Sequence, residues 1–190
     1  MSQEREVRIR NAVERVKSWM NVHGAEVLVE NLARGASGAQ LDADEQAYGF
    51  RFPADLRALW SVHAGQHDEQ NGFVGAMDLL GPGAEKENVA MFLGFLREDP
   101  DSWEEAGVTP QEVQSDAWVA FAGRGYADLL VVSASSGRVF SCAKDSPPFH
   151  LVAESILDWL EAYADRVEAG TYHVEEGFGD CYLARDEALF

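Results

Sequence analysis

The sequence lacks most of the features that would indicate a class of protein directly. Its 190 residues include only two cysteines, Cys142 and Cys181, which lie far apart and form no Cys-x-x-Cys pair. Such isolated cysteines form neither a disulfide framework nor a metal-binding knuckle, so we expect reduced thiols and a cytoplasmic location. No apolar run approaches the ~20 residues that a membrane-spanning helix needs. The charged start, MSQEREVRIR, predicts no signal peptide.

Sequence motifs of catalysis are also missing. The chain has no G-x-S-x-G elbow, no P-loop and no Rossmann fingerprint. His63 and His67 have the i, i+4 spacing of zinc-binding helices, but Gly65 lies between them and should end the helix. No pair of carboxylates stands apart from the generally acidic composition. The sequence therefore predicts a protein that is not an enzyme and that holds no metal and no cofactor.

Basic residues are scarce. The chain has 15 Lys and Arg against 33 Asp and Glu, a net charge of −18. Residues 98–190 contribute 5 basic and 19 acidic groups, which is −14 of this total. A field of this sign repels nucleic acid and anionic lipid and speeds association with a cationic partner. We expect no nucleic-acid or membrane binding, and two interpretations remain: a surface that is acidic for solubility, or one that binds a basic protein.

The patterns in the first third of the chain predict helices. An apolar stripe at helical spacing runs from Ile9 to Met20, and residues 25–32 form a second short helical pattern. Ser37 begins the capping-box sequence Ser-Gly-Ala-Gln, which predicts a third helix that ends near Tyr48. These patterns predict a group of helices at the N-terminal end of the chain.

The stretch YGFRFPADLRALWSVHAGQ, residues 48–66, predicts a further helix rather than the edge of an active site. Pro53 is suited to the first helical position, and Gly65 to the end of the helix. Between them, one helical face carries Leu56, Leu59, Trp60 and His63. We therefore expect these side chains to form core and the histidines to be turn residues.

The second half changes to the period of a sheet. Residues 72–80 are strand-like, and residues 88–96 return to a helical pattern. Three apolar segments follow, at residues 118–122, 126–133 and 138–143. Glycine- and serine-rich turns separate them, which is typical of an antiparallel meander, and residues 151–153 fit a further short strand. An amphipathic helix from Ile156 to Val167 follows.

Together these segments predict a single α+β domain. It should have N-terminal helices, a central, mostly antiparallel sheet and a closing C-terminal amphipathic helix. We expect residues 1–34 to be an N-terminal helical extension, residues 35–172 to be the main domain, and residues 173–190 to be an acidic and aromatic tail to which no structure is assigned.

An acidic insertion precedes the meander and contains the candidate binding site. The sequence EDPDSWEE places one tryptophan among carboxylates in a polar segment, and the candidate residues are Glu98, Asp99, Asp101, Trp103, Glu104 and Glu105, with Asp68 and Glu69 as neighbours. Aromatic anchors and complementary charge dominate many protein interfaces, so this segment fits a basic protein partner. The alternative is that Trp103 folds back onto the sheet and the carboxylates form a solvated rim.

The order of these segments resembles the Smi1/Knr4 family of the SUKH superfamily, from about Gly35 to about Tyr172. The segments that carry the resemblance are Tyr48–Leu56, Leu59-Trp60, His63–Gly65, Trp118–Ala122, Gly125–Val132, Gly137–Val139 and Val152–Leu160. The chain departs from the family pattern where Ala120 replaces the usual proline, where Ser133 replaces a common aspartate, and in its acidic insertion.

The resemblance implies an α+β fold and, in bacteria, an immunity protein that binds and neutralises a polymorphic toxin, often a nuclease. It provides no catalytic or contact residues. We therefore expect a non-enzymatic immunity protein whose partner is a basic, cognate toxin domain. The alternative function is a regulatory scaffold or peptide-binding module without a toxin, as in fungal members of the family. The sequence makes no prediction of oligomeric state.

Overall fold

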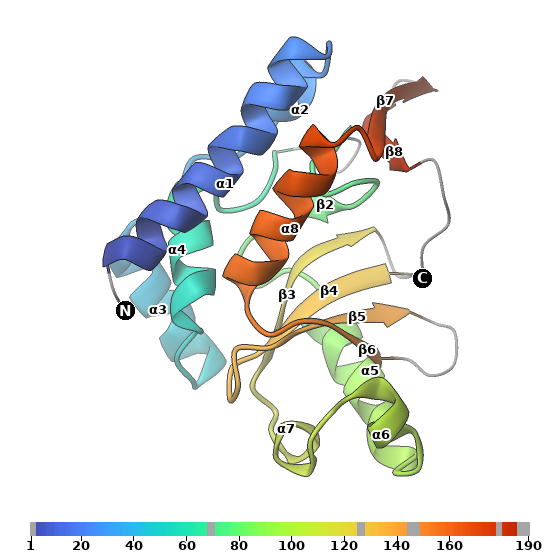
Figure 1. The fold of residues 1–190 in the computed structure, drawn as a ribbon. Helices are drawn as coiled ribbons and strands as arrows, with labels where there is room; N and C mark the ends of the chain where they lie inside the picture. Colours follow the sequence, from blue (N-terminus) through green and yellow to red (C-terminus); the bar gives the residue numbers. More distant parts are fainter. Residues whose placement is uncertain (1–2, 68–70, 125–127, 144–148, 178–179, 186–190) are drawn as a thin grey trace.

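The computed structural model describes residues 3–67, 71–124, 128–143, 149–177 and 180–185. In these ranges the chain folds as one α+β domain, with helices on both faces of an antiparallel five-stranded sheet and a smaller three-stranded sheet beside it (Figure 1). The expected fold class is confirmed. The amphipathic helix does not close the chain, however, because two further strands follow it. The division at residues 34 and 172 stays a prediction.

The central sheet has the strand order β2-β3-β4-β5-β6, and every neighbouring pair is antiparallel. Its strands are β2 (Asp78–Leu79), β3 (Trp118–Arg124), β4 (Asp128–Ser133), β5 (Val139–Ala143) and β6 (Phe149–Ala153). The last four follow each other directly, which confirms the meander. Most residues of β3, β4 and β5 are buried, because helices cover both faces of these strands.

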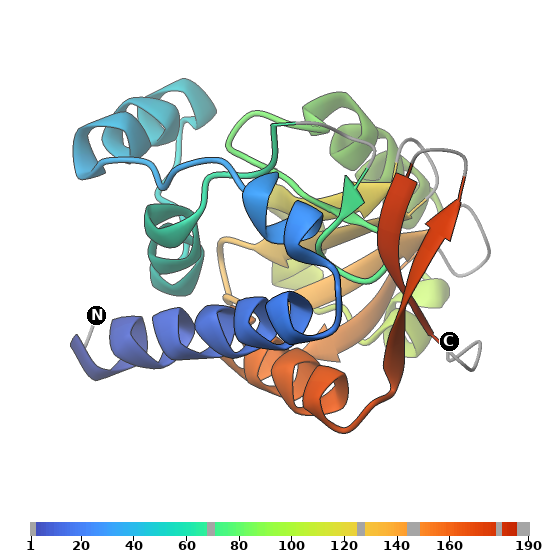
Figure 2. The ribbon, with the colours of Figure 1, turned by 90° about the horizontal axis from the view of Figure 1, so that it is seen from above.

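One face of the sheet packs against the N-terminal helices and α8 (Ile156–Glu168). The helices on this side are α1 (Gln3–Val22), α2 (Glu26–Glu30), α3 (Gly38–Tyr48) and α4 (Ala54–Val62). Figures 1 and 2 both show α1 lying along α8. Ion pairs tie these two helices together: Arg8 contacts Glu161 at 2.6 Å, and Arg15 contacts Asp165 at 2.6 Å.

The other face packs against α5 (Lys86–Glu98), α6 (Ser102–Ala106) and α7 (Pro110–Gln114). The residues that follow the acidic stretch 98–105 belong to the core. Ala106, Val108 and Val113 are buried against the sheet, where they join Phe140 and Phe149. Two short helices with apolar inner faces therefore form part of this layer.

A bulge in β3 determines which of its side chains face the buried cluster on the α8 side of the sheet and which face the cluster on the α5 side. The register shifts between Ala120 and Ala122, so that Phe121 has no partner on β4. Phe121 and Ala122 consequently both face the α8 side, whereas Ala120 faces the α5 side. The Phe121 ring meets Trp159 of α8 edge-on, with centroids 5.1 Å apart.

The predicted core role of the 48–66 stretch is confirmed. Trp60 is fully buried, its Nε1 donates to the Leu80 carbonyl at 2.8 Å, and its ring meets Phe52 edge-on at 5.1 Å. The capping box before it is also present: Ser37 accepts from the Gln40 amide, and its own amide donates to the Gln40 side chain. Local signals were sufficient here because each lies within one or two turns of helix.

The end of this stretch differs from the expectation. Pro53 is the N-cap rather than the first helical residue, and α4 ends at Val62, so His63 is an extended C-cap and not part of the helical face. Gly65 has another role: with φ +98° it approaches the turn at Gly81 so closely that a Cβ would lie 2.7 Å from the Gly81 amide nitrogen.

The C-terminal segment, to which the sequence assigned no structure, forms a hairpin. Strands β7 (Tyr172–Gly177) and β8 (Asp180–Arg185) are antiparallel, and β8 also pairs in parallel with β1 (Asn71–Gly72). Cys181 and Leu183 of β8 are buried in the α8-side core. The hairpin stands beside the end of α8, at the right of Figure 2.

Candidate functional site

The predicted acidic residues lie together on the α5–α6 side of the molecule. Glu98 is the last residue of α5, Asp99 and Asp101 follow it, and Glu104 and Glu105 belong to α6. All five are exposed, and none of them forms an ion pair with any residue that the structure describes. Their charge is therefore available to a partner.

Two carboxylates that follow this stretch, between it and β3, have structural roles instead. Glu112 is 1% exposed and pairs with Arg138 at 3.0 Å, and Asp116 pairs with Arg97 at 2.7 Å. Arg97 also donates to the carbonyls of Val113 and Ser115, which fixes the end of α7 to α5. Sequence composition alone could not separate these two acids from the five exposed ones.

The position of Trp103 combines features of both alternatives, the exposed binding anchor and the ring folded back onto the protein. Its ring is half-buried and packs against the core on the α5 side, and its Nε1 donates to the Leu96 carbonyl at 2.7 Å. The indole N–H is thus satisfied within the protein, and the ring joins α6 to α5. Glu104 and Glu105 follow Trp103 directly in α6. Its role in binding stays a prediction.

Sequence reasoning missed two apolar side chains at this site. Phe95 and Met91 of α5 are 51% and 38% exposed, although both are large and hydrophobic. They are four residues apart, and Glu98 follows Phe95 by three residues, so these three share one side of the helix, and Asp99 follows directly as its C-cap. The signal was present in the sequence: both residues are out of phase with the buried face formed by Val89, Phe92, Leu93 and Leu96.

We call this surface the acidic face and define it by Met91, Phe95, Glu98, Asp99, Asp101, Trp103, Glu104 and Glu105. It combines exposed carboxylates with two exposed apolar side chains. Figure 1 shows α5 and α6 on the opposite side of the sheet from α1 and α8. The other two predicted residues, Asp68 and Glu69, lie outside the described residues.

The histidines considered for a metal site are separated. The ring of His63 donates from Nδ1 to the Ala33 carbonyl at 2.9 Å, and burial lowers the pKa of His63. His67 is exposed and follows the extended stretch after α4, so the two do not share a helical face. Across the described ranges, no group of three or more His, Cys, Asp or Glu could hold a metal ion.

The thiol of Cys142 is also placed in the core. It lies in β5 among the apolar side chains of the α5 side, and burial raises the pKa of Cys142 well above its ordinary value. A thiol in such surroundings stays protonated and unreactive.

None of the helices in the described ranges is long and apolar enough to span a membrane.

Comparison with known proteins identifies the fold family. No curated protein matches the chain. The SMI1 / KNR4 family (SUKH-1) matches residues 35–162, which extend from the turn before α3 into α8 and cover about two-thirds of the sequence. The chain therefore belongs to the SMI1/KNR4 family.

Proposed function

We propose that this SMI1/KNR4 domain is a non-enzymatic immunity protein, which binds a basic toxin domain through its acidic face and thereby neutralises it. The observation that carries the proposal is the combination of five exposed carboxylates, which pair with no cation in the described part of the chain, with the exposed side chains of Phe95 and Met91. Family membership supports the general class of function. The carboxylates of the acidic face support the proposal that the partner is basic.

Two physical contributions would act at different stages of binding. The carboxylates attract a cationic partner over several ångströms and raise the association rate, an effect that salt screens. Phe95, Met91 and the exposed part of Trp103 lose contact with water in the complex, which slows dissociation. For a nucleic-acid-cleaving toxin, the carboxylates would occupy the positions that phosphates take in its basic cleft. Inhibition then follows from occupation of the cleft and needs no chemistry by this chain.

Binding kinetics test this proposal on the product of a toxin gene adjacent to the gene of this protein. Glu104→Lys/Glu105→Lys should lower the association rate on the order of tenfold at low ionic strength and much less at high salt. The matched control is Glu4→Lys/Glu6→Lys, which makes the same charge change at exposed positions of α1. Phe95→Ala should mainly raise the dissociation rate.

The outcomes separate the acidic face from a general charge effect. Equal losses from the α6 and α1 double variants would mean that net charge, and not this face, steers the partner. Wild-type kinetics for all three variants at both salt concentrations would place the binding surface elsewhere and leave the carboxylates as a solvated rim. Absence of any binding to the toxin would favour the regulatory scaffold.

A further inference from the structure

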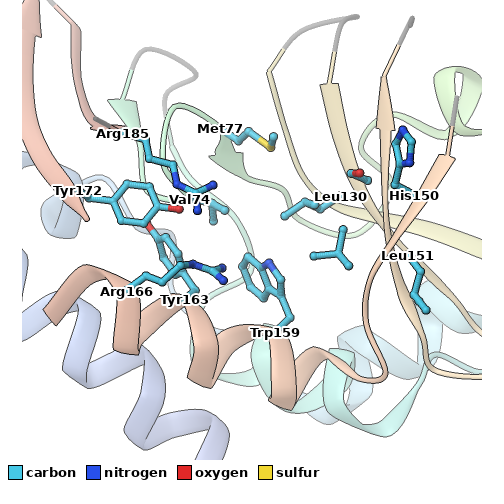
Figure 3. A pocket seen from close by; sticks show the side chains of 12 residues that line it. Val74, Met77, Leu130, His150, Leu151, Trp159, Tyr163, Arg166, Tyr172 and Arg185 are labelled. Carbon is cyan, nitrogen blue, oxygen red and sulfur yellow. The ribbon is translucent and has the colours of Figure 1, made fainter. Parts of the chain in front are cut away.

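A cavity of about 420 Å³ lies on the α8 side of the sheet, away from the acidic face. Its walls come from strands β4, β5 and β6, from α8, and from the β7–β8 hairpin (Figure 3). This volume falls in the range of small-molecule sites, which are mostly apolar with a few polar groups. The cavity has this composition: aliphatic and aromatic side chains dominate its lining, and Arg166 and Arg185 are its charged residues.

Aromatic rings form one wall, and hydrogen bonds hold them in place. Trp159 and Tyr163 stack in parallel, with centroids 5.6 Å apart, and Tyr172 meets Tyr163 edge-on at 5.4 Å. The Tyr163 hydroxyl donates to the Phe73 carbonyl at 2.8 Å and accepts from the Gly75 amide at 2.9 Å. The ring of Tyr163 is therefore fixed, and its hydroxyl is already engaged. Trp159 and Tyr163 are 5% and 2% exposed, so the half-buried ring of Tyr172 is the most open of the three to a ligand.

The charge of the cavity is opposite to that of the protein. Figure 3 shows the guanidinium groups of Arg166 and Arg185 extending into the cavity, and no Asp or Glu is among the described residues that line it. Arg166 forms no ion pair with any described residue, and its buried Nε has no hydrogen-bond partner there. Two of the five basic residues in positions 98–190 thus line one cavity of a chain with a net charge of −18.

We propose that this cavity binds a small organic anion with a flat, apolar ring system and one carboxylate or sulfonate group. The rings lie against Trp159 and Tyr172, and the anionic group accepts hydrogen bonds from Arg166 and Arg185, since guanidinium groups match the geometry of such anions. The negative field of the whole protein opposes entry, but salt screens charges beyond ~8 Å at physiological ionic strength. Contacts inside the cavity are screened much less and decide the affinity.

Two dyes with the same ring system test the proposal on the full chain. 1-Anilinonaphthalene-8-sulfonate carries an anionic group, and N-phenyl-1-naphthylamine is its uncharged counterpart. Fluorescence titration should give tighter binding of the sulfonate. Arg166→Met should weaken sulfonate binding by about tenfold, the value of a charge-assisted hydrogen bond, and change the uncharged dye by less than about twofold. Arg10→Met, at an exposed position of α1, makes the same charge change and should alter neither affinity.

Further measurements keep the test independent of folding defects. Val152→Trp places a large side chain at a cavity-lining position that is 42% exposed, and it should weaken both dyes without unfolding the sheet. Circular dichroism and thermal melting check each variant. Equal wild-type affinities for the two dyes would overturn the proposal, as would equal effects of Arg166→Met and Arg10→Met or wild-type binding by Val152→Trp. If Arg166→Met fails to fold, the dye comparison on the wild type and Val152→Trp decide.

Discussion

Arg138, the residue directly before β5, donates from Nη1 to the carboxylate of Glu112 in α7 at 3.0 Å, and it donates from Nη2 to the Gly107 carbonyl at 2.5 Å. One side chain thereby connects the end of α6, α7 and the sheet. Glu112 is 1% exposed and also accepts from Ser136 and from the amide of Thr109. The layer that carries the acidic face is held to the sheet by this buried network.

Removing the cation from this pair should destabilise the protein strongly. Arg138→Met leaves the buried carboxylate of Glu112 without its main partner, and we expect a loss of about 3 kcal/mol in the free energy of unfolding. The double variant Arg138→Met/Glu112→Met should lose less than the sum of the two single variants, because neither charge then remains unpaired. Urea denaturation of the four proteins measures the coupling. Strictly additive losses would show that the pair does not act as a unit.

Trp60 should be among the most sensitive core positions. Trp60→Ala removes a fully buried ring and its hydrogen bond to Leu80, and we expect a loss of ~3–5 kcal/mol. Chemical denaturation checks this value, and Val22→Ala at a 79% exposed position of α1 is the control, with little expected change. A loss below about 1 kcal/mol for Trp60→Ala would contradict the buried position of the ring.

The hydrogen bond of Trp103 can be separated from the ring by two substitutions. Trp103→Phe removes the donor to the Leu96 carbonyl and should cost about 1 kcal/mol, whereas Trp103→Ala also removes the half-buried ring and should cost more. Thermal and urea denaturation of both variants measure this difference. The Phe variant is therefore the better probe of partner binding. Wild-type stability of both variants would mean that Trp103 does not join α6 to α5.

His63 should make stability fall in mild acid. Burial lowers the pKa of His63 below 6.5, and the hydrogen bond to the Ala33 carbonyl only partly opposes this effect. Because the unfolded chain then binds a proton more readily, stability is full above about pH 6.5 and is lost as the pH falls toward the folded-state pKa. His63→Asn should flatten this part of the pH profile in urea denaturation. An unchanged slope would assign the acid sensitivity to other groups.

The elements that sequence predicted well depend on neighbouring residues. The capping box at Ser37, the buried face around Trp60 and the meander of β3 to β5 are each set by spacing and turn residues within a short window. The β1–β8 pairing was not predicted because it is distant in the chain: Asn71 of β1 lies opposite Cys181 of β8. The β7–β8 hairpin pairs neighbouring residues, but without β1 the edge that it joins is not visible in the sequence. Acidic residues in β7, such as Glu175, also hide the alternation of a strand.

The candidate site shows a similar limit. Sequence located the exposed carboxylates from Glu98 to Glu105, because a dense run of charge must lie largely at the surface. The direction of Trp103 depends on a carbonyl at Leu96, and the pairing of Glu112 depends on Arg138, which is 26 residues away. Such partners become visible only when the chain is folded. Phe95 is different, since its position out of phase with the helix stripe could have identified it.

Growth rescue tests the central claim most directly. The toxin domain from the adjacent gene is expressed in a host with the wild-type chain, with Glu104→Lys/Glu105→Lys/Phe95→Ala, or with the α1 control Glu4→Lys/Glu6→Lys, at matched protein levels. The account predicts that the wild type and the control restore growth and that the acidic-face variant does not. Rescue by all three would contradict neutralisation through the acidic face, and rescue by none would contradict the immunity function itself.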